Sequence, residues 1–332
     1  MLLSERIAKG CYWQKAWSLI EGCSYVSEGC TNCWSAAQAH MRANQRNEKI
    51  RSRYAGLTNA DGRWNGQIRL MENNLDLPLR VKKPTVWSVW NDLFHPDVPF
   101  EYIRAGLARM ATAWQHTFLV LTKRPERMKE FFDWMEMRMQ EFKVESYLPH
   151  IWFGVTVENH DQAEMRIPIL LQTPTAVRFV SCEPLLGFLY LSPWLGISRF
   201  ADDAPWTRDT GSDIDWIITG GETGPGTRPM HPDWVRSLLD QCQASGTPFF
   251  FKHWGEFIVP KDGARSCRVC GCTWHNACQG GCSWVEADLC SNCIGKPTPP
   301  YRAVKFRRVG KKKAGRLLDG RTWDEFPKIL EK

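Results

Sequence analysis

The amino-acid sequence predicts an α/β protein whose main domain is a parallel βα barrel, complete or partial. Short runs of β-branched and aromatic residues recur between about residues 84 and 257, helical patterns separate several of them, and a polar motif follows each run. The runs are TVWSVW (85–90), TFLVL (117–121), IWFGVTV (151–157), AVRFVS (176–181), DWIITG (215–220) and PFFFKHW (248–254). They are nearly continuous in apolar residues, as expected of parallel strands covered on both faces.

Amphipathic helical patterns lie between these runs. The first places Ile103, Leu107, Met110 and Trp114 on one face. The second begins at Pro125, and its apolar face, expected to pack in the core, comprises Met128, Phe131, Phe132, Met135, Met139 and Phe142. The third begins at Pro232, ends at Gly246, and carries an apolar stripe of Val235, Leu238, Leu239 and Cys242. The alternation of strands and helices favours a parallel sheet.

Polar residues follow each predicted strand directly. They are Asn91, Asp92 and His95; Thr122, Lys123 and Arg124; Glu158 and Asn159; Cys182 and Glu183; Gly220, Gly221 and Glu222; and Lys252 and His253. In a βα barrel all strands point the same way, so their carboxyl ends meet at one rim, where active sites lie. A doubly wound sheet, the alternative, would gather only the motifs near its switch point. The barrel therefore predicts one pocket built from six separate motifs.

The composition divides the chain into three segments. Residues 1–257 are expected to form the barrel domain, residues 258–300 a cysteine-rich metal-binding insert, and residues 301–332 a basic stretch with a final amphipathic segment. Within the first segment, residues 195–214 have the composition of a loop between two strands.

The overall composition is that of a soluble globular protein. Of the 332 residues, 43% are apolar and 24% are charged, which excludes disordered, collagen-like and coiled-coil chains. The net charge of +7 permits an anionic partner but does not establish one. No apolar run approaches the ~18 residues that a membrane helix needs, and the first residues, MLLSERIAKG, contain no apolar signal core. We therefore expect a cytoplasmic protein with no membrane partner.

Three cysteines lie close together near the amino terminus. Six residues separate Cys23 from Cys30, and two separate Cys30 from Cys33. Three such thiolates can hold three corners of a four-iron cluster and leave the fourth iron open to a small ligand. The alternative is a zinc site that a distant histidine or aspartate completes. In either case the cluster of thiols without a signal peptide indicates a metal site in a reducing compartment.

Several rim residues have side chains suited to ligand binding. Glu158 and Glu183 suit an amino group or ribose hydroxyls, and Lys123 and Arg124 suit a carboxylate or phosphate. Asp92 would orient a substrate, together with His95. For each of these residues a helix cap or a surface ion pair is the structural alternative.

Motifs along nearly the whole chain resemble a phage-associated, radical-SAM-like family of domains of unassigned function. The amino-terminal match is Gly22-Cys23, Gly29-Cys30, Cys33 and the aromatic Trp34. It continues through DLFHPDVP (92–99), LTKRPERM (121–128), GVTVEN (154–159), FVSCEPLLG (179–187), GGETGPGTRPMHPDWVRSL (220–238), FFKHWGE (250–256) and GKKKAGRLLDGRTWDEFP (310–327). The usual radical S-adenosylmethionine (SAM) spacing is three and two residues, whereas here it is six and two.

The resemblance implies a radical-SAM-type partial barrel and assigns roles to its residues. It implies a [4Fe–4S] cluster on Cys23, Cys30 and Cys33, with SAM on the open iron. Gly220-Gly221-Glu222 is similar to the GGE motif that contacts the methionine amino group, although that motif normally follows an early strand. The implied cofactor-binding residues are Gly220, Gly221, Glu222, Glu158 and Ser181, and the implied catalytic residues are Glu183, Lys123, Arg124 and Asp92. Residues 301–332 would close the barrel domain.

The resemblance also implies an enzyme. Members are carried by phages, and some are implicated in DNA base hypermodification. We therefore expect a radical SAM enzyme, of isomerase or base-modifying class, that acts on a substituent of a hypermodified thymine in DNA or a nucleotide, with an external electron donor, in the cytoplasm of an infected host. The alternatives are a non-catalytic, zinc-dependent nucleic-acid-binding protein and an iron–sulfur enzyme without radical chemistry.

A second group of cysteines lies in the insert. Cys267-x-x-Cys270 and Cys290-x-x-Cys293 form two knuckles nineteen residues apart, which is typical of structural zinc. Cys272, Cys278 and Cys282 remain, with His275 nearby. They would hold either a second zinc or an auxiliary iron–sulfur cluster.

The segment that follows is strongly basic. Residues 302–316, RAVKFRRVGKKKAGR, contain eight basic residues in fifteen. Next to zinc knuckles, such a stretch suggests contact with a phosphate backbone. A solvated surface or a structural closing segment is the alternative interpretation.

Overall fold

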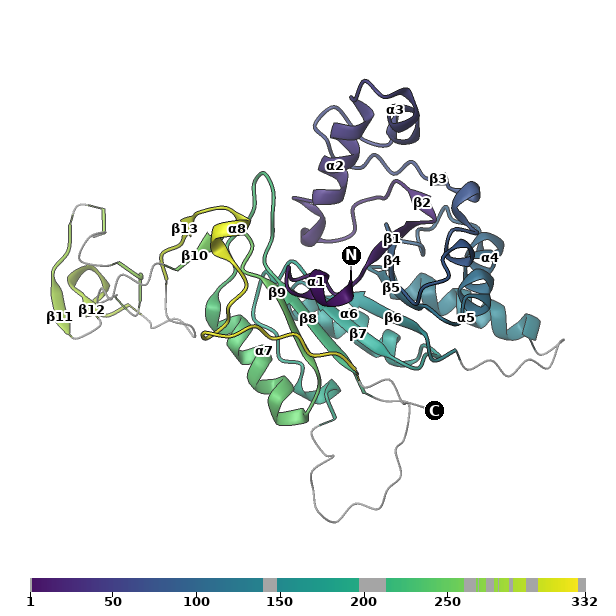
Figure 1. Cartoon of the computed structure of the whole chain (residues 1–332). Helices are drawn as coiled ribbons and strands as arrows, with labels where there is room; N and C mark the ends of the chain where they lie inside the picture. Colours follow the sequence, from purple (N-terminus) through teal and green to yellow (C-terminus); the bar gives the residue numbers. More distant parts are fainter. Residues whose placement is uncertain are drawn as a thin grey trace, which may run out of the picture.

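A seven-stranded, entirely parallel sheet forms the centre of the computed structural model (Figure 1). The structure describes residues 2–139, 148–196, 213–259, 267, 269–272, 278–279, 281–286, 289–296 and 304–327. The strands are β1 (Lys15–Ser18), β4 (Val86–Trp90), β5 (Thr117–Thr122), β6 (Ile151–Thr156), β7 (Arg178–Cys182), β8 (Trp216–Gly220) and β9 (Phe249–His253). Each strand pairs in parallel with the next one in the order β1-β4-β5-β6-β7-β8-β9.

This order never reverses, so the sheet has no switch point of the doubly wound kind. Strands β1 and β9 lie at opposite edges and do not pair with each other. The fold is therefore a parallel βα half-barrel, which confirms the predicted class.

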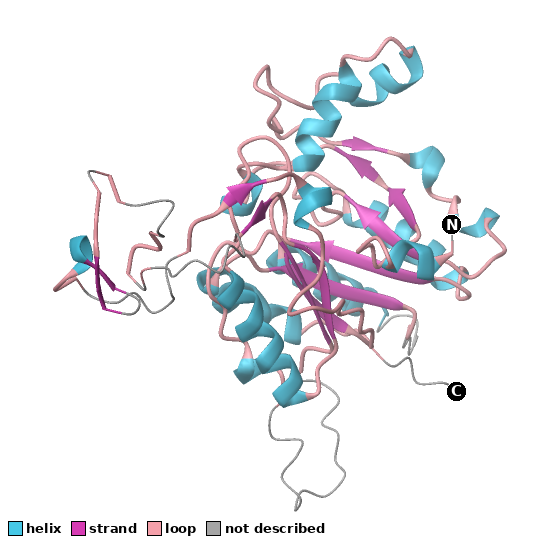
Figure 2. Ribbon diagram, turned by 60° about the vertical axis from the view of Figure 1, so that its left-hand side comes forward, coloured by secondary structure: helices cyan, strands magenta, loops and turns pink. Residues whose placement is uncertain are grey.

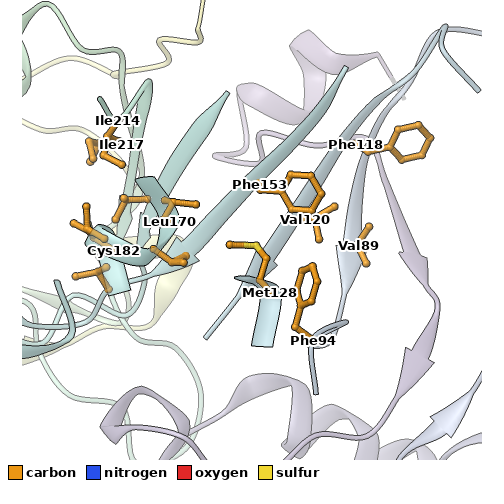
Figure 3. Close-up of a cluster of buried hydrophobic side chains, with 14 of the residues drawn as sticks. Val89, Phe94, Phe118, Val120, Met128, Phe153, Leu170, Cys182, Ile214 and Ile217 are labelled. Carbon is orange, nitrogen blue, oxygen red and sulfur yellow. The ribbon is translucent and has the colours of Figure 1, made fainter. Parts of the chain in front are cut away.

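Four helices follow strands of the sheet and cover one of its faces. They are α4 (Phe100–Thr112), α5 (Pro125–Met139), α6 (His160–Leu171) and α7 (Pro232–Ser245). Apolar side chains from both layers form the main core, in which Met128 of α5 lies beside Phe94 and Phe153 (Figure 3). Gly246 ends α7 in the left-handed conformation, as the sequence predicted. Trp114 was expected on the apolar face of α4, but it lies beyond the end of that helix and is 75% exposed. Phe142 lies outside the described residues.

The inner face of the half-barrel has a separate core. Because side chains alternate along a strand, Phe118 joins the helix-facing core while Leu119 points to the inner face. Tyr12, from the segment before β1, packs edge-on against Trp216 and Phe250 there. The inner core consists of Tyr12, Leu119, Trp152, Phe179, Trp216, Ile218 and Phe250.

The carboxyl-terminal segment covers the free edge of β9. The amide of Phe251 donates to the carbonyl of Trp323 at 2.9 Å, and Phe250 forms an antiparallel bridge with Asp324. The backbone groups of this edge strand are thereby paired rather than left open to another chain.

Smaller elements lie around the strand ends. The amino-terminal half contributes α1 (Leu3–Ile7), β2 (Ile20–Glu21), η1 (Glu28–Cys30), α2 (Trp34–Ala43), α3 (Glu48–Tyr54), β3 (Arg69–Leu70), η2 (Glu72–Asn74) and η3 (Pro78–Arg80), and η4 (Ser192–Trp194) follows β7. Strand β2 pairs with β3, and helices α2 and α3 pack together at the top of Figure 1.

The cysteine-rich module lies to one side of the half-barrel in both ribbon views (Figures 1 and 2). It contains β11 (Trp284–Glu286), β12 (Leu289–Cys290) and η6 (Ser291–Cys293). The strands that flank it in sequence, β10 (Phe257–Ile258) and β13 (Arg307–Arg308), pair antiparallel, and α8 (Lys311–Ala314) follows. None of the described helices has the length and apolar character needed to cross a membrane.

Candidate functional site

A cavity of about 540 Å³ opens at the carboxyl ends of the strands. Five of the six strand-following motifs contribute to its wall, and β6 contributes Thr156. The rim residues that line it are Asn91, Asp92, Thr122, Lys123, Arg124, Ser181, Glu183, Gly221, Glu222, Lys252 and His253. This volume is within the ~300–1,000 Å³ typical of ligand pockets. The structure thus brings together the polar motifs that the sequence placed at one rim.

The three early cysteines line the same cavity. They lie on the connection between β2 and α2: Cys23 follows β2, Cys30 ends η1, and Cys33 immediately precedes α2. Gly22, at φ +99°, lets the chain turn where a Cβ atom would collide with the carbonyl oxygen of Gln67. We call residues 22–33 the cysteine loop.

Arg124 connects β5 to the start of the cysteine loop. Its guanidinium forms an ion pair with Asp92 at 2.6 Å and donates to the Ser24 carbonyl at 3.1 Å and to the Ser24 hydroxyl at 2.7 Å. The same group lies 3.8 Å from the Cys23 sulfur. His95 completes the attachment, because its Nε2 is 2.8 Å from the Ser24 hydroxyl. Arg124 is therefore already partnered, and the geometry favours positioning of the loop over binding of a free anion.

Glu158 is fully buried behind the cavity wall. It forms ion pairs with Lys123 and, at 2.9 Å, with Arg166, and it accepts a hydrogen bond from the Ser27 hydroxyl at 2.6 Å. Burial opposes ionisation of Glu158, but the two cations lower its pKa below the ordinary value. The side chain packs so closely on Gly29 that a Cβ atom there would collide with it. The sequence predicted that Glu158 faces the cavity and binds a ligand. In the structure it contacts the cysteine loop instead and does not line the cavity.

Glu222 ties the end of β8 to the far side of the cysteine loop. It accepts hydrogen bonds from Asn32 at 3.0 Å and from the Arg228 guanidinium at 2.6 and 3.0 Å. Arg228 also donates to the Glu28 carbonyl at 2.9 Å. Burial raises the pKa of Glu222, but these donors outweigh it and the net pKa is lowered. The Glu222 carboxylate therefore lines the cavity in its ionised form. Asn32, which directly precedes Cys33, and Arg228 hold it in place.

The two glycines before Glu222 serve packing. A Cβ atom on Gly220 would meet the Glu183 carboxylate, and one on Gly221 would meet the backbone of Trp254 and Gly255. Gly221 lines the cavity, whereas Gly220 does not. Gly221 thus lets the segments after β8 and β9 approach each other, and Gly220 leaves room for the Glu183 side chain that follows β7.

Lysines gather at the β9 end of the cavity. Lys252 pairs with Glu183 at 3.0 Å, and Ser181 donates a hydrogen bond to the same carboxylate at 3.4 Å. Lys311 of α8 and Lys9 also line the cavity, and neither side chain has an ion-pair or hydrogen-bond partner within the described residues. Partial desolvation and the charge of Lys252 lower the pKa of Lys311. This end of the cavity can therefore accept an anionic group.

Aromatic side chains form much of the remaining wall. Trp34 lies edge-on to Trp90 with ring centroids 5.3 Å apart, and Trp90 lies edge-on to Trp13 at 6.0 Å. Tyr12 and Trp64 also line the cavity. Trp34 is 50% exposed, so half of its surface remains available for contact with a ligand. Such a wall suits the face or edge of a heteroaromatic ring.

The three thiols of the cysteine loop do not lie close enough together, as placed, to share a single metal ion. Thiolates around one zinc at ~2.3 Å lie within about 4 Å of one another. In the described part of the chain, no group of three metal-ligating atoms within 4.8 Å of one another includes Cys23, Cys30 or Cys33. Burial and the Asp92 carboxylate raise the pKa of Cys23 to about 12, so metal binding would have to displace its proton.

The late cysteines, in contrast, do form compact groups. The predicted knuckles assemble into one quartet, Cys267, Cys270, Cys290 and Cys293, able to hold a metal. A second quartet comprises Cys270, Cys272, Cys278 and Cys290. Cys282 lies outside both quartets, although its sulfur is 3.6 Å from the Cys272 sulfur. The predicted second set of Cys272, Cys278 and Cys282 is thus only partly assembled, and His275 lies outside the described residues.

Parts of the basic stretch are built into the half-barrel. Arg316 pairs with Asp324 and donates to the Phe251 carbonyl at 3.2 Å, and Arg308 pairs with Glu256 at 2.5 Å. Lys311 faces the cavity, as described above. Contact between this stretch and nucleic acid stays a prediction.

The fold and site define a class: a parallel βα half-barrel with a cysteine-lined cavity at its carboxyl rim and a module of cysteines able to hold a metal. The sequence model of a family described as protein of unknown function (DUF5131) matches residues 8–327, so the chain belongs to that family. The match includes the cysteine loop, the rim motifs and the module. Searches of curated proteins and of solved structures found no match.

Proposed function

We propose that this protein is a radical SAM enzyme of phage type that modifies or rearranges a substituent on a hypermodified thymine, in DNA or a nucleotide. One observation carries the proposal: the three thiols of the cysteine loop and the polar ends of all but the edge strand β1 line a single cavity. An enzyme needs reactive and binding groups around one space, whereas a structural zinc site would be closed.

In this proposal the residues of the chain would have three roles: cluster binding, ligand binding and positioning of the cysteine loop. Cys23, Cys30 and Cys33 would hold a [4Fe–4S] cluster with one open corner. Such a cluster, when reduced, supplies the electron that splits SAM and yields a radical able to abstract hydrogen. Glu222 and Glu183 line the cavity with Arg228 and Lys252 as partners, so each would receive the amino group or hydroxyls of a ligand beside the partner it already has. Arg124 and Glu158 would keep the cysteine loop in position through their hydrogen bonds with Ser24 and Ser27.

The cavity walls support a substrate with an aromatic ring and a negative charge. The wall of Trp13, Trp34, Trp64 and Trp90 suits a nucleobase, and the lysines at the β9 end suit a phosphate or carboxylate. The net charge of +7 is compatible with a nucleic-acid substrate.

Formation of 5′-deoxyadenosine tests the proposed chemistry directly. We expect anaerobically reconstituted protein, given SAM and a chemical reductant, to release 5′-deoxyadenosine detectable by mass spectrometry. Iron-loaded protein that releases none would indicate an iron–sulfur enzyme without radical chemistry. A colourless protein that holds only zinc would favour the nucleic-acid-binding alternative.

Replacement of Lys311 by alanine tests the anionic end of the cavity. We expect SAM or a thymidine nucleotide to bind roughly 10- to 150-fold more weakly, because a hydrogen bond to a charged group contributes roughly 1.5–3 kcal/mol. Equilibrium dialysis measures the affinity. Lys312→Ala is the matched control, since Lys312 is the next residue on α8 and does not line the cavity. Equal affinities for the two variants would remove Lys311 from the binding site.

A further inference from the structure

The cysteines of the module lie together as one group of sulfur atoms. The two quartets that can hold a metal each have all their sulfurs within 4.8 Å of one another. They are not separate, because both contain Cys270 and Cys290. The Cys270–Cys290 pair is therefore an edge common to two potential metal sites.

The distances between sulfurs match tetrahedral zinc. Cys270 lies 3.6 Å from both Cys278 and Cys290, and Cys278 lies 3.9 Å from Cys290. Four thiolates at ~2.3 Å from one zinc are separated by about 3.8 Å along each edge of the tetrahedron. These three sulfurs thus outline one face of a zinc-thiolate tetrahedron, with Cys272 as the fourth member of that quartet.

The fold of the module depends on these sulfurs. Within its described residues, the buried cluster consists of Cys267, Cys272, Cys290 and Cys293 with Leu289 as the sole other buried side chain. Such a small interior supplies little hydrophobic stabilisation, so metal binding would have to provide most of the folding free energy. Backbone amides already point at sulfurs: the amide of Val269 donates to the Cys267 sulfur, and that of Cys278 to the Cys282 sulfur, each at 3.4 Å.

We propose that the module binds two zinc ions that share the thiolates of Cys270 and Cys290. Two independent four-thiolate sites would need eight cysteines, whereas the module has seven. Two tetrahedra that share an edge need six, and the two quartets supply these six. Binding releases the thiol protons to solvent and leaves two Zn²⁺ with six thiolates, at a net charge of minus two. Cys282, next to Cys272, remains outside the shared centre.

Metal content and cadmium NMR test the shared centre on the full chain. In the Cys30→Ala background, which is expected to remove iron binding by the cysteine loop, the shared centre predicts about two zinc ions per chain and no sulfide. After exchange with ¹¹³Cd, two resonances with mutual scalar coupling are expected, because the ions share sulfur ligands. One zinc per chain, two uncoupled resonances, or iron with sulfide in the module would each overturn the proposal.

Two cysteine variants give an independent measurement. Cys293→Ser removes a ligand from one ion only, so one zinc per chain should remain. Cys270→Ser removes a ligand from both ions, so both should be lost to a mild chelator at the same concentration. Separate sites would instead lose one zinc in each variant. Thermal unfolding of the half-barrel, whose two cores include none of these cysteines, reports whether the rest of each variant is folded.

Discussion

Replacement of Cys30 by alanine is expected to abolish iron binding by the cysteine loop. Anaerobically reconstituted wild-type protein should hold about four iron and four sulfide ions per chain in a [4Fe–4S] cluster. With two thiolates left, Cys23 and Cys33, the cluster loses a third of its protein ligands. Iron and acid-labile sulfide should fall to background, while the two zinc ions proposed for the cysteine-rich module should be unchanged.

Cys11 provides the matched control for that experiment. It lines the same cavity, but its sulfur accepts a hydrogen bond from Arg6 at 2.9 Å and lies 3.4 Å from the Trp13 carbonyl. Cys11→Ala should therefore retain full iron content. Loss of iron in Cys11→Ala would mean that a fourth cysteine closes the cluster, which contradicts an open corner for SAM. Full iron content in Cys30→Ala would contradict the assignment of the loop itself.

The sequence predicted six of the seven strands of the sheet, because buried parallel strands leave continuous apolar runs. Strand β1 left no such signal: it has four residues, of which only Trp17 is buried, and its pairing with β4 makes it a strand. Helix α6 also escaped prediction. It contains Pro168, and Arg166 lies on its buried side, where the pattern requires an apolar residue.

The rim of the site was predictable because strand direction alone places the polar motifs. The hydrogen-bond partners of these rim residues were not predictable from the sequence. Asn32 and Glu222 are 190 residues apart, and Ser27 and Glu158 are 131 apart, so only the folded topology brings them together. For the same reason the sequence indicates Lys311 only as part of a basic stretch, although its side chain lines the cavity. A local sequence pattern identifies the polar residues that follow a strand. No local pattern identifies which residues from distant parts of the chain form hydrogen bonds with them.

Replacement of Glu158 by glutamine should lower the free energy of unfolding by roughly 3–5 kcal/mol, the usual cost of removing one partner from a buried ion pair. Arg166 is the reason. Its side chain is 3% exposed, and without the carboxylate its charge would be buried among neutral acceptors, such as the Thr156 carbonyl at 2.7 Å, with no counter-ion. Lys123 would lose its ion pair as well. Urea unfolding at pH 7 measures the effect.

The pH dependence of this difference identifies its electrostatic origin. The pKa of Glu158 in the folded protein lies below the ordinary value of 4.5, so the unfolded chain binds the proton first as pH falls. The stabilisation is therefore complete well above pH 4.5 and is lost as pH falls through the folded pKa, where wild type and variant should converge. Glu164→Gln, on the helix α6 that carries Arg166, removes only an exposed pair with His160 and should change stability by less than about 0.5 kcal/mol. A Glu158→Gln variant as stable as this control, or a difference independent of pH, would show that the buried carboxylate does not hold the cysteine loop in place.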